Sequence, residues 1–199
     1  VLEVMASDPR FCRYLDMPFQ HISDPVLKKM NRKITRKEIE ATMSRVRRKL
    51  PDVAWRTTFI VGFPTETDQD FEELVDFVSE GHFQHLGIFL YSDEDNIRSS
   101  KFGDPIPLSL KEERKNRLME IQQKISREHH QKMVGSLQQV LVGGFSSETD
   151  LLLEGRNQYQ GPEVDGVVYI NEGNATSAGF HQVEITEAHE YDLVGKILN

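Results

Sequence analysis

The segment Val53–Phe71, VAWRTTFIVGFPTETDQDF, decides the fold class. Its first nine residues, 53–61, are rich in β-branched and aromatic side chains, which predicts a buried strand. Gly62 and Pro64 end this strand, and Thr67 supplies the N-cap of a helix that carries aspartates in its first turn. A strand, a glycine turn and a capped helix in this order are typical of a βα unit in a parallel sheet.

Similar patterns extend this unit in both directions along the chain. Upstream, residues 13–18 predict a short strand, and residues 35–50 predict a helix whose apolar side chains recur every three to four positions. Downstream, residues 85–91 predict another strand, and residues 109–134 predict a long charged helix that opens with a capping box. The alternation of strands and helices predicts an α/β fold over residues 1–134.

The pattern changes after residue 134. Short runs of alternating apolar residues follow, separated by turn residues, which predicts a small all-β barrel over residues 135–199. The predicted strands are residues 137–142, 151–153, 166–170, 183–185 and 193–197. We therefore expect two domains, 1–134 and 135–199.

Charge divides the chain at the same place. The net charge of −8 arises from 24 basic and 32 acidic residues. Residues 1–134 hold 22 of each sign, whereas residues 135–199 hold only Arg156 and Lys196 against ten acidic side chains. Such an acidic module is expected to repel phosphate backbones and to attract basic protein surfaces. The alternative is a surface whose charge only keeps the module soluble.

Composition excludes several classes of protein. Apolar residues make up 38% and charged residues 28% of the chain, as in globular proteins, and no apolar run approaches the ~18 residues that span a bilayer. The single cysteine, Cys12, provides no disulfide framework and no cysteine-based metal site. Together with the lack of a secretory signal, this predicts a cytoplasmic protein. Because the chain begins at Val1 in the middle of a pattern, we expect a fragment of a longer protein.

Candidate binding residues follow the predicted parallel strands, because ligands of α/β sheets bind at the carboxyl ends of strands. Gly62 leaves room for a flat group to approach the backbone, and Glu66 offers a hydrogen-bond acceptor to a ribose or an amine. Gln20, His21 and Ser23 follow the first strand within PFQHISD. The alternatives are a plain strand-to-helix turn and a helix N-cap beside an incidental histidine.

Other polar residues are weaker candidates. Arg32 and Arg56 have the side chain that binds a carboxylate through two parallel hydrogen bonds, but a surface charge is the favoured interpretation of each. Residues 91–93 end the third strand, where they are candidates to line the same site; the alternative, which we favour, is a plain loop. His129 and His130 fall on the polar long helix, which predicts that both are exposed to solvent.

Six segments together resemble one enzyme family, the methylthiotransferases of the radical S-adenosylmethionine enzymes. They are YLDMPFQHISDPVLKKMNR (14–32), RTTFIVGFPTET (56–67), FLYSDED (89–95), ERKNRLMEIQQKIS (113–126), PEVDGVVYI (162–170) and EYDLVG (190–195). The motifs QHISD and EVDGVVYI resemble the branch that modifies a small-subunit ribosomal protein more than the branch that modifies tRNA.

The resemblance implies the latter part of a TIM-like radical barrel followed by a TRAM domain, which is an OB-like barrel. It implies S-adenosylmethionine and [4Fe-4S] clusters as cofactors, with cluster cysteines in a CxxxCxxC motif and in a further domain upstream. Cys12 lies outside such a spacing, so we expect this chain to hold no metal ligand and no catalytic residue, and to be inactive alone. The family reaction would add a β-methylthio group to an aspartate, after a radical has removed a hydrogen from its β-carbon.

By position, the resemblance also assigns binding residues. Those placed at the cofactor are Gln20, Ser23, Arg56, Gly62 and Glu66, with Arg56 at the methionine carboxylate. In the barrel, Glu163 and Asp165 precede a strand, where OB-like barrels often meet ligands, so we expect both to contact a basic ribosomal protein. The acidic barrel makes tRNA an unfavourable partner. A tRNA-modifying enzyme of the same family and a non-catalytic docking module remain the alternatives.

Overall fold

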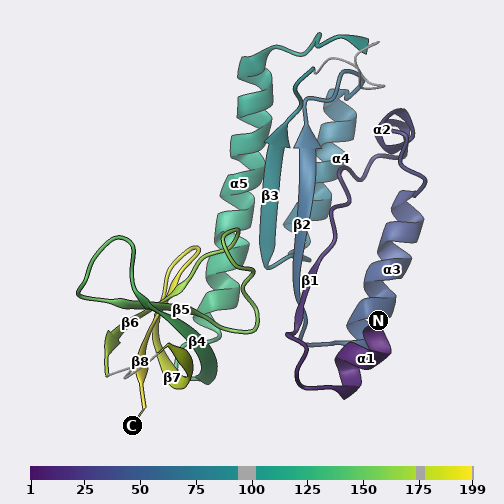
Figure 1. Cartoon of the computed structure of the whole chain (residues 1–199). Helices are drawn as coiled ribbons and strands as arrows, with labels where there is room; N and C mark the ends of the chain where they lie inside the picture. The colour runs from purple at the N-terminus through teal and green to yellow at the C-terminus, as the bar shows by residue number, and fades with distance from the viewer. Residues whose placement is uncertain (94–101, 174–177, 199) are drawn as a thin grey trace. The chain divides into compact units, whose positions relative to one another are not determined.

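A computed structural model describes residues 1–93, 102–173 and 178–198, and these fold into two compact units (Figure 1). The first unit comprises Val1–Asp8 and Leu15–Gln122, and the second comprises Pro9–Tyr14 and Gln123–Asn199. The boundary between the units falls within a long helix. The predicted division into domains at residue 134 stays a prediction.

The first unit is built on a three-stranded sheet in the order β1-β2-β3, in which β2 and β3 run parallel (Figure 1). Its elements are α1 (Leu2–Ser7), β1 (Tyr14–Asp16), α2 (Asp24–Lys29), α3 (Arg36–Lys49), β2 (Ala54–Val61), α4 (Asp68–Ser79), β3 (His85–Leu90) and the first part of α5 (Leu108–Gln131). The predicted α/β class with a parallel sheet is thereby confirmed. Helix α1 is an addition that the sequence pattern did not predict.

Strand β2 has two different faces because successive side chains of a strand point in opposite directions. Trp55, Phe59 and Val61 are buried in a core with apolar residues of α3, α4 and α5. Arg56 and Thr58 alternate with them and lie on the other, partly exposed face. The helices therefore bury one face of this sheet, and the second face presents polar groups along β2.

Helices α3 and α4 both start with complete capping boxes at threonine residues, and the one at Thr67 was predicted from the sequence. In α3 the Thr35 hydroxyl accepts from the Glu38 amide, and the Glu38 carboxylate accepts from the Thr35 amide. Thr67 and Asp70 make the same reciprocal pair at the start of α4. These bonds satisfy amide groups that a helix cannot pair within its first turn, so the two helices begin where local sequence places them.

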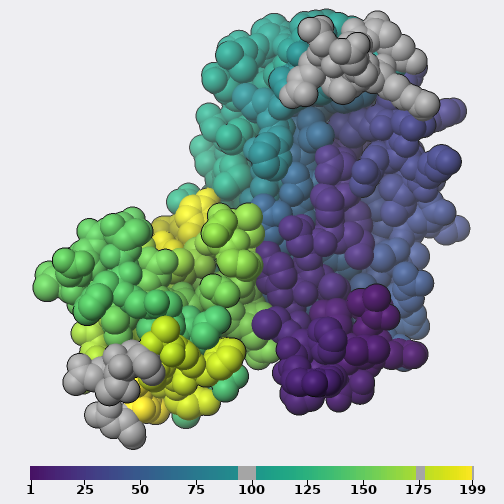
Figure 2. Space-filling view, viewed as in Figure 1, coloured from purple at the N-terminus to yellow at the C-terminus, as the bar shows by residue number. Residues whose placement is uncertain are grey.

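The second unit contains a closed five-stranded barrel in the order β4-β5-β6-β8-β7, which confirms the predicted all-β barrel. Its strands are β4 (Leu137–Phe145), β5 (Leu153–Arg156), β6 (Val168–Glu172), β7 (Gly179–Ala188) and β8 (Leu193–Ile197). Its core consists of buried valine, isoleucine and leucine side chains of four strands, β4, β6, β7 and β8. The barrel residues, green to yellow in Figure 2, form a compact body of their own.

Two local expectations are corrected by the fold. Helix α5 ends at Gln131 rather than near residue 134, and a turn leads from it into β4. The expectation that His130 is solvated is wrong, because its ring is buried and its Nδ1 lies 3.1 Å from the carbonyl oxygen of His189. Among the described residues, no helix is long and apolar enough to cross a membrane.

Candidate functional site

The carboxyl ends of β1 and β2 lie side by side and bring four of the predicted cofactor residues to one edge of the sheet. The Gln20 amide donates to the Thr58 carbonyl at 2.9 Å, and the Ile60 amide donates to the Gln20 carbonyl at 2.9 Å. Gln20 has a φ of +74°, a left-handed conformation that costs a side-chain-bearing residue free energy. The β1 chain therefore turns away sharply where the strand ends.

The turn after β2 is closed by its own glutamate. One carboxylate oxygen of Glu66, Oε2, accepts from the amides of Gly62 at 2.8 Å and Phe63 at 3.3 Å. The Glu66 side chain is completely buried. Because its oxygens are bonded within the protein, Glu66 stabilises the turn, and its predicted contact with a ribose or an amine stays a prediction.

Arg114 on α5 is the partner of this buried carboxylate. Its Nη1 donates to Glu66 Oε1 at 2.7 Å, and its Nη2 donates to Asp68 Oδ1 at 2.7 Å. The guanidinium carbon lies 5.2 Å from the centre of the Phe71 ring, and only 4% of the side chain is exposed. Sequence reasoning missed Arg114, because a charged residue on a charged helix looks like a solvated one.

His21 lies on the other side of Glu66. Its ring is fully buried, and its Nδ1 accepts from the Ser23 amide at 3.0 Å, which assigns the ring proton of the neutral form to Nε2. That Nε2 lies 3.7 Å from Glu66 Oε2. Within the described part of the chain, it has no hydrogen-bond partner. His21 Nε2 therefore has a free donor close to the carboxylate that closes the Gly62 turn.

Ser23 is bound to the start of α4. Its hydroxyl, fully buried, donates to Asp70 Oδ1, while Asp70 Oδ2 accepts from the amide and hydroxyl of Thr67. Burial alone would raise the pKa of Asp70, but the hydrogen bonds from Ser23 and Thr67 outweigh it and hold the pKa below its usual value. The charged carboxylate thus ties the end of β1 to α4.

The space beside Gly62 is filled by a lysine. Gly62 has a φ of +76°, and a Cβ atom built on it would overlap Cγ of Lys111. The Lys111 ammonium group is held by the carbonyl of Tyr91 at 2.8 Å and by Oδ2 of Asp104 at 2.6 Å. Glycine is therefore required at this position by α5, and a ligand at this turn has to approach from the side away from Lys111.

Arg56 is not brought to the same edge. It faces His85 at the start of β3, six residues before Gly62, which corresponds to roughly 20 Å along a strand. Its Nη1 donates to Asp16 Oδ2 at 2.9 Å, and the guanidinium lies across Gly87, where a side chain would crowd it. Arg56 therefore lies on the partly exposed sheet face, and its predicted contact with a carboxylate stays a prediction.

The weaker candidates Arg32 and Tyr91 both make contacts within the first unit. Arg32 donates through Nη2 to the carbonyl of Pro18 at 3.0 Å, which ties α2 to the end of β1. Tyr91 is buried against Phe63, with ring centres 5.3 Å apart. The loop expected after β3 includes residues 94–101, which lie outside the described residues.

The barrel places its two predicted contact residues differently. Glu163 is exposed at a loop position with a φ of +64°. Asp165 braces that loop, because its Oδ2 accepts from the Tyr14 hydroxyl at 2.7 Å and from the Gly161 amide at 2.7 Å. Glu163 is thus presented to solvent on a loop that Asp165 helps to close.

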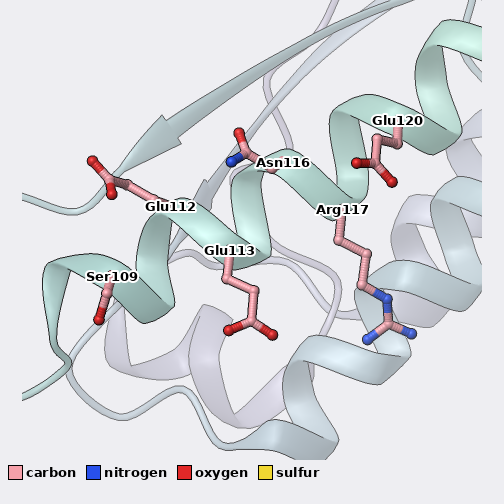
Figure 3. A pocket seen from close by; sticks show the side chains of 6 residues that line it. All are labelled: Ser109, Glu112, Glu113, Asn116, Arg117 and Glu120. Atoms are coloured by element: carbon pink, nitrogen blue, oxygen red, sulfur yellow. The ribbon is translucent and has the colours of Figure 1, made fainter.

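A shallow hollow on the first turns of α5 carries further charge (Figure 3). It is lined by Ser109, Glu112, Glu113, Asn116, Arg117 and Glu120. Arg117 extends away from the helix and donates through Nη2 to Glu72 of α4 at 2.7 Å. Over residues 1–93, 102–173 and 178–198, no group of three or more histidine, cysteine, aspartate and glutamate side chains is arranged to hold a metal ion.

Comparisons with known families agree with this architecture. Residues 1–78 match the radical SAM superfamily, and residues 134–198 match the TRAM domain. A parallel α/β unit followed by a TRAM barrel defines the class, a radical S-adenosylmethionine protein with a C-terminal TRAM domain.

Curated relatives narrow the class further. The chain is 48% identical over 198 residues to the ribosomal protein uS12 methylthiotransferase RimO of Bdellovibrio bacteriovorus, covering all of this chain and 43% of the relative. It is 46% identical to RimO of Desulfotalea psychrophila and 42% identical to RimO of Geobacter sulfurreducens, again over the whole chain and 45% and 44% of those proteins. The chain belongs to the RimO family of radical S-adenosylmethionine methylthiotransferases. It spans less than half the length of these relatives.

Proposed function

We propose that the protein containing this chain adds a methylthio group to an aspartate of ribosomal protein uS12, and that this chain provides the later strand ends of the radical barrel and the TRAM domain. The main support is the 41–48% identity to RimO proteins over the entire chain. It extends through both units, so it includes the strand-end edge and the barrel.

The strand-end edge offers a nucleoside-sized polar ligand two sharply turned backbones, at Gln20 and Gly62. Within the described residues, the buried Nε2 of His21 at the same edge has no hydrogen-bond partner and lies 3.7 Å from Glu66 Oε2. These features fit S-adenosylmethionine approaching from the side of Gly62 that Lys111 leaves free. When bound, the cofactor and the [4Fe-4S] clusters supply the radical and sulfur chemistry, with cluster ligands expected outside this chain.

Within this proposal the residues of the chain bind and orient. Gln20 and the Gly62 turn contact the adenosine part. Ser23 supports the Gln20 backbone through its bond to Asp70, and Glu66 supports the Gly62 turn through its bonds to the turn amides. Arg56 lies away from this edge, where Asp16 holds it on the partly exposed sheet face, and its proposed contact with a carboxylate is the least supported of the five. We assign none of these side chains a covalent step.

The barrel is proposed to dock the protein substrate. Ten acidic side chains against two basic ones give this module a strongly negative potential, which accelerates encounter with a basic protein and opposes contact with phosphates. Glu163, exposed on its loop, and Asp165, which braces that loop, are the proposed contact residues. A ribosomal substrate also accounts for the predicted cytoplasmic location.

The decisive experiment uses the full-length protein with its clusters reconstituted anaerobically. We expect mass spectrometry to detect the methylthio group on an aspartate of uS12, and no modified nucleoside in tRNA offered under the same conditions. Modification of tRNA alone would favour the tRNA-modifying alternative. Binding of uS12 without any modification would favour the docking module.

A second experiment concerns the chain alone. Anaerobic reconstitution followed by iron analysis is expected to find no stoichiometric iron, because one cysteine is present where a [4Fe-4S] cluster needs about four ligands, commonly thiolates. Iron at cluster stoichiometry would contradict the assignment of the cluster ligands to another part of the protein.

A further inference from the structure

We propose that Arg114 and His21 are positioning residues for the S-adenosylmethionine site, acting through the buried carboxylate of Glu66. The inference rests on the proposed function and adds two residues that the family resemblance did not assign. Neither is proposed to touch the reacting atoms. Their role is to hold the two sharply turned strand ends in the conformation that the cofactor meets.

The two oxygens of Glu66 bind different parts of the protein. Oε2 accepts the amides of Gly62 and Phe63, and Oε1 accepts Nη1 of Arg114. A carboxylate held at both oxygens cannot rotate, so the conformation of the Gly62 turn depends on α5. Because the side chains of Glu66 and Arg114 are 0% and 4% exposed, water cannot replace either partner.

His21 links the same carboxylate to the end of β1. His21 directly follows Gln20, and its Nε2 lies 3.7 Å from Glu66 Oε2, close enough for electrostatic attraction but too far for a hydrogen bond. Its Nδ1 accepts the Ser23 amide at 3.0 Å, which fixes the ring. Both left-handed residues of the site are therefore linked to Glu66. Gly62 donates its own amide to the carboxylate, and Gln20 is followed in the chain by His21, whose ring faces it.

The contacts of Arg114 require an arginine at this position. The guanidinium donates to two carboxylates in different places, Glu66 in the turn and Asp68 in the first turn of α4, while its face lies against the Phe71 ring. Lysine has a single ammonium group and no flat face, so it can replace only part of this arrangement. Arg114 thus joins α5, the turn and α4 around the site.

The place of His21 Nε2, rather than its lack of a bond, suggests a positioning role. Among the described residues this buried donor has no hydrogen-bond partner, and it lies 3.7 Å from the Glu66 oxygen that closes the Gly62 turn. A small closure of the strand ends around a ligand would shorten the 3.7 Å separation to a hydrogen bond. Cofactor binding is therefore expected to strengthen the contact between His21 and Glu66.

The test compares Arg114→Met with Arg117→Met in the full-length, cluster-loaded protein. Arg117 is a matched control, because it lies one turn further along α5, pairs with Glu72 of α4 and faces the same Phe71 ring, yet 46% of its side chain is exposed. We expect Arg114→Met to weaken equilibrium binding of S-adenosylmethionine roughly tenfold, as the loss of a supporting shell does elsewhere. The KM for the cofactor rises to match, and kcat at saturation changes less than about threefold.

Arg114→Lys is a milder second variant, which keeps the test informative if Arg114→Met does not fold. It retains the charge opposite Glu66 and is expected to bind the cofactor with an affinity between those of the wild type and Arg114→Met. His21→Gln is expected to weaken binding severalfold, with the same split between KM and kcat. Thermal unfolding of each variant accompanies the binding measurement.

Two outcomes would overturn the inference. One is cofactor affinity within twofold of the wild type in folded Arg114→Lys and His21→Gln proteins. The other is an equal loss of affinity in Arg117→Met, which would make the effect a general consequence of loosening α5. Either result leaves the proposed function standing, because that function fails only if the wild-type protein neither binds S-adenosylmethionine nor modifies uS12.

Discussion

The charges of the α/β unit and of the barrel are used in opposite ways. Over residues 1–134 acidic side chains are matched by an equal number of basic ones, and several pairs, such as Arg114 with Glu66 and Lys111 with Asp104, lie at the strand ends. Residues 135–199 hold ten acidic residues and two basic ones, with Glu190 also paired to Arg127 of α5, and the barrel core is made of apolar side chains. Lys196 pairs with Glu184 at 3.3 Å, which occupies one of those two cations.

The difference shows what each unit does with its charge. Buried pairs cost desolvation energy, so a protein that retains them inside an α/β unit gains geometry rather than stability from them. Surface acids without matching cations cost little, and they generate a field that reaches a partner before contact. Under the proposed function, the buried pairs of the first unit hold the strand-end site, and the acidic residues of the barrel attract a basic partner.

The largest expected effect comes from breaking the buried pair. Glu66→Ala leaves Arg114 buried without its main partner and frees the Gly62 turn, so we expect a loss of about 3–5 kcal/mol in the free energy of unfolding. Chemical denaturation of the full-length protein measures it. Glu72→Ala is the control, because it breaks the exposed pair with Arg117 one turn away and should change stability very little. Equal effects of the two substitutions would remove the contrast between buried and exposed pairs.

A glycine substitution separates backbone strain from crowding. Gly62→Ala places a methyl group against Lys111 in a left-handed conformation, and we expect a loss of about 2–4 kcal/mol. Gly81→Ala is the control, because Gly81 is also left-handed, at φ +72°, but a Cβ atom there would have no described atom within 4 Å. Only the backbone cost of about 1 kcal/mol is therefore expected. If urea denaturation gave equal losses for the two variants, Lys111 would not fill the space beside Gly62.

The next largest effect is the pH dependence of stability that Asp70 produces. The lowered pKa of Asp70 means that its charged form stabilises the folded protein at pH values above the ordinary value of 3.8, and that this stabilisation is lost as the pH falls from there through the folded-state pKa. Asp70→Asn should cost about 1–2 kcal/mol at pH 7, and the difference from the wild type should shrink below pH 4. Denaturation curves at both pH values measure it. A difference that persists unchanged in acid would show that Asp70 acts by packing rather than by charge.

The smallest effect on stability is expected in the barrel. Glu163→Lys changes an exposed loop side chain and should leave the unfolding midpoint nearly unchanged, while weakening association of the full-length protein with uS12 several-fold at low salt. Raising the salt concentration should reduce the difference, because screening weakens long-range attraction. A salt-independent loss of affinity would identify Glu163 as a directly packed contact instead of a steering charge.

Local sequence was sufficient for much of this protein because the relevant interactions are local. The capping residues Thr35 and Thr67 bond to groups three residues away, and the apolar spacing of α4 needs only its own turn geometry. The βαβ order and the switch to short alternating strands after residue 134 follow from the same short-range rules. The charge division between residues 1–134 and 135–199 could be counted directly from the sequence.

Tertiary structure decided how the candidate site is built, because the bonds that matter join residues far apart in the chain. Arg114 meets Glu66 across 48 positions, and Ser23 meets Asp70 across 47, so neither pair has a spacing that local patterns reveal. The side of Gly62 that is occupied, and the burial of His130 in a polar helix, likewise depend on which elements pack together. The sequence by itself determined the elements, their order and the sign of each surface, since these depend on nearby residues and on composition. Only the fold decided which charges are buried together, since the energy of a buried charge depends on partners that the chain brings together when it packs.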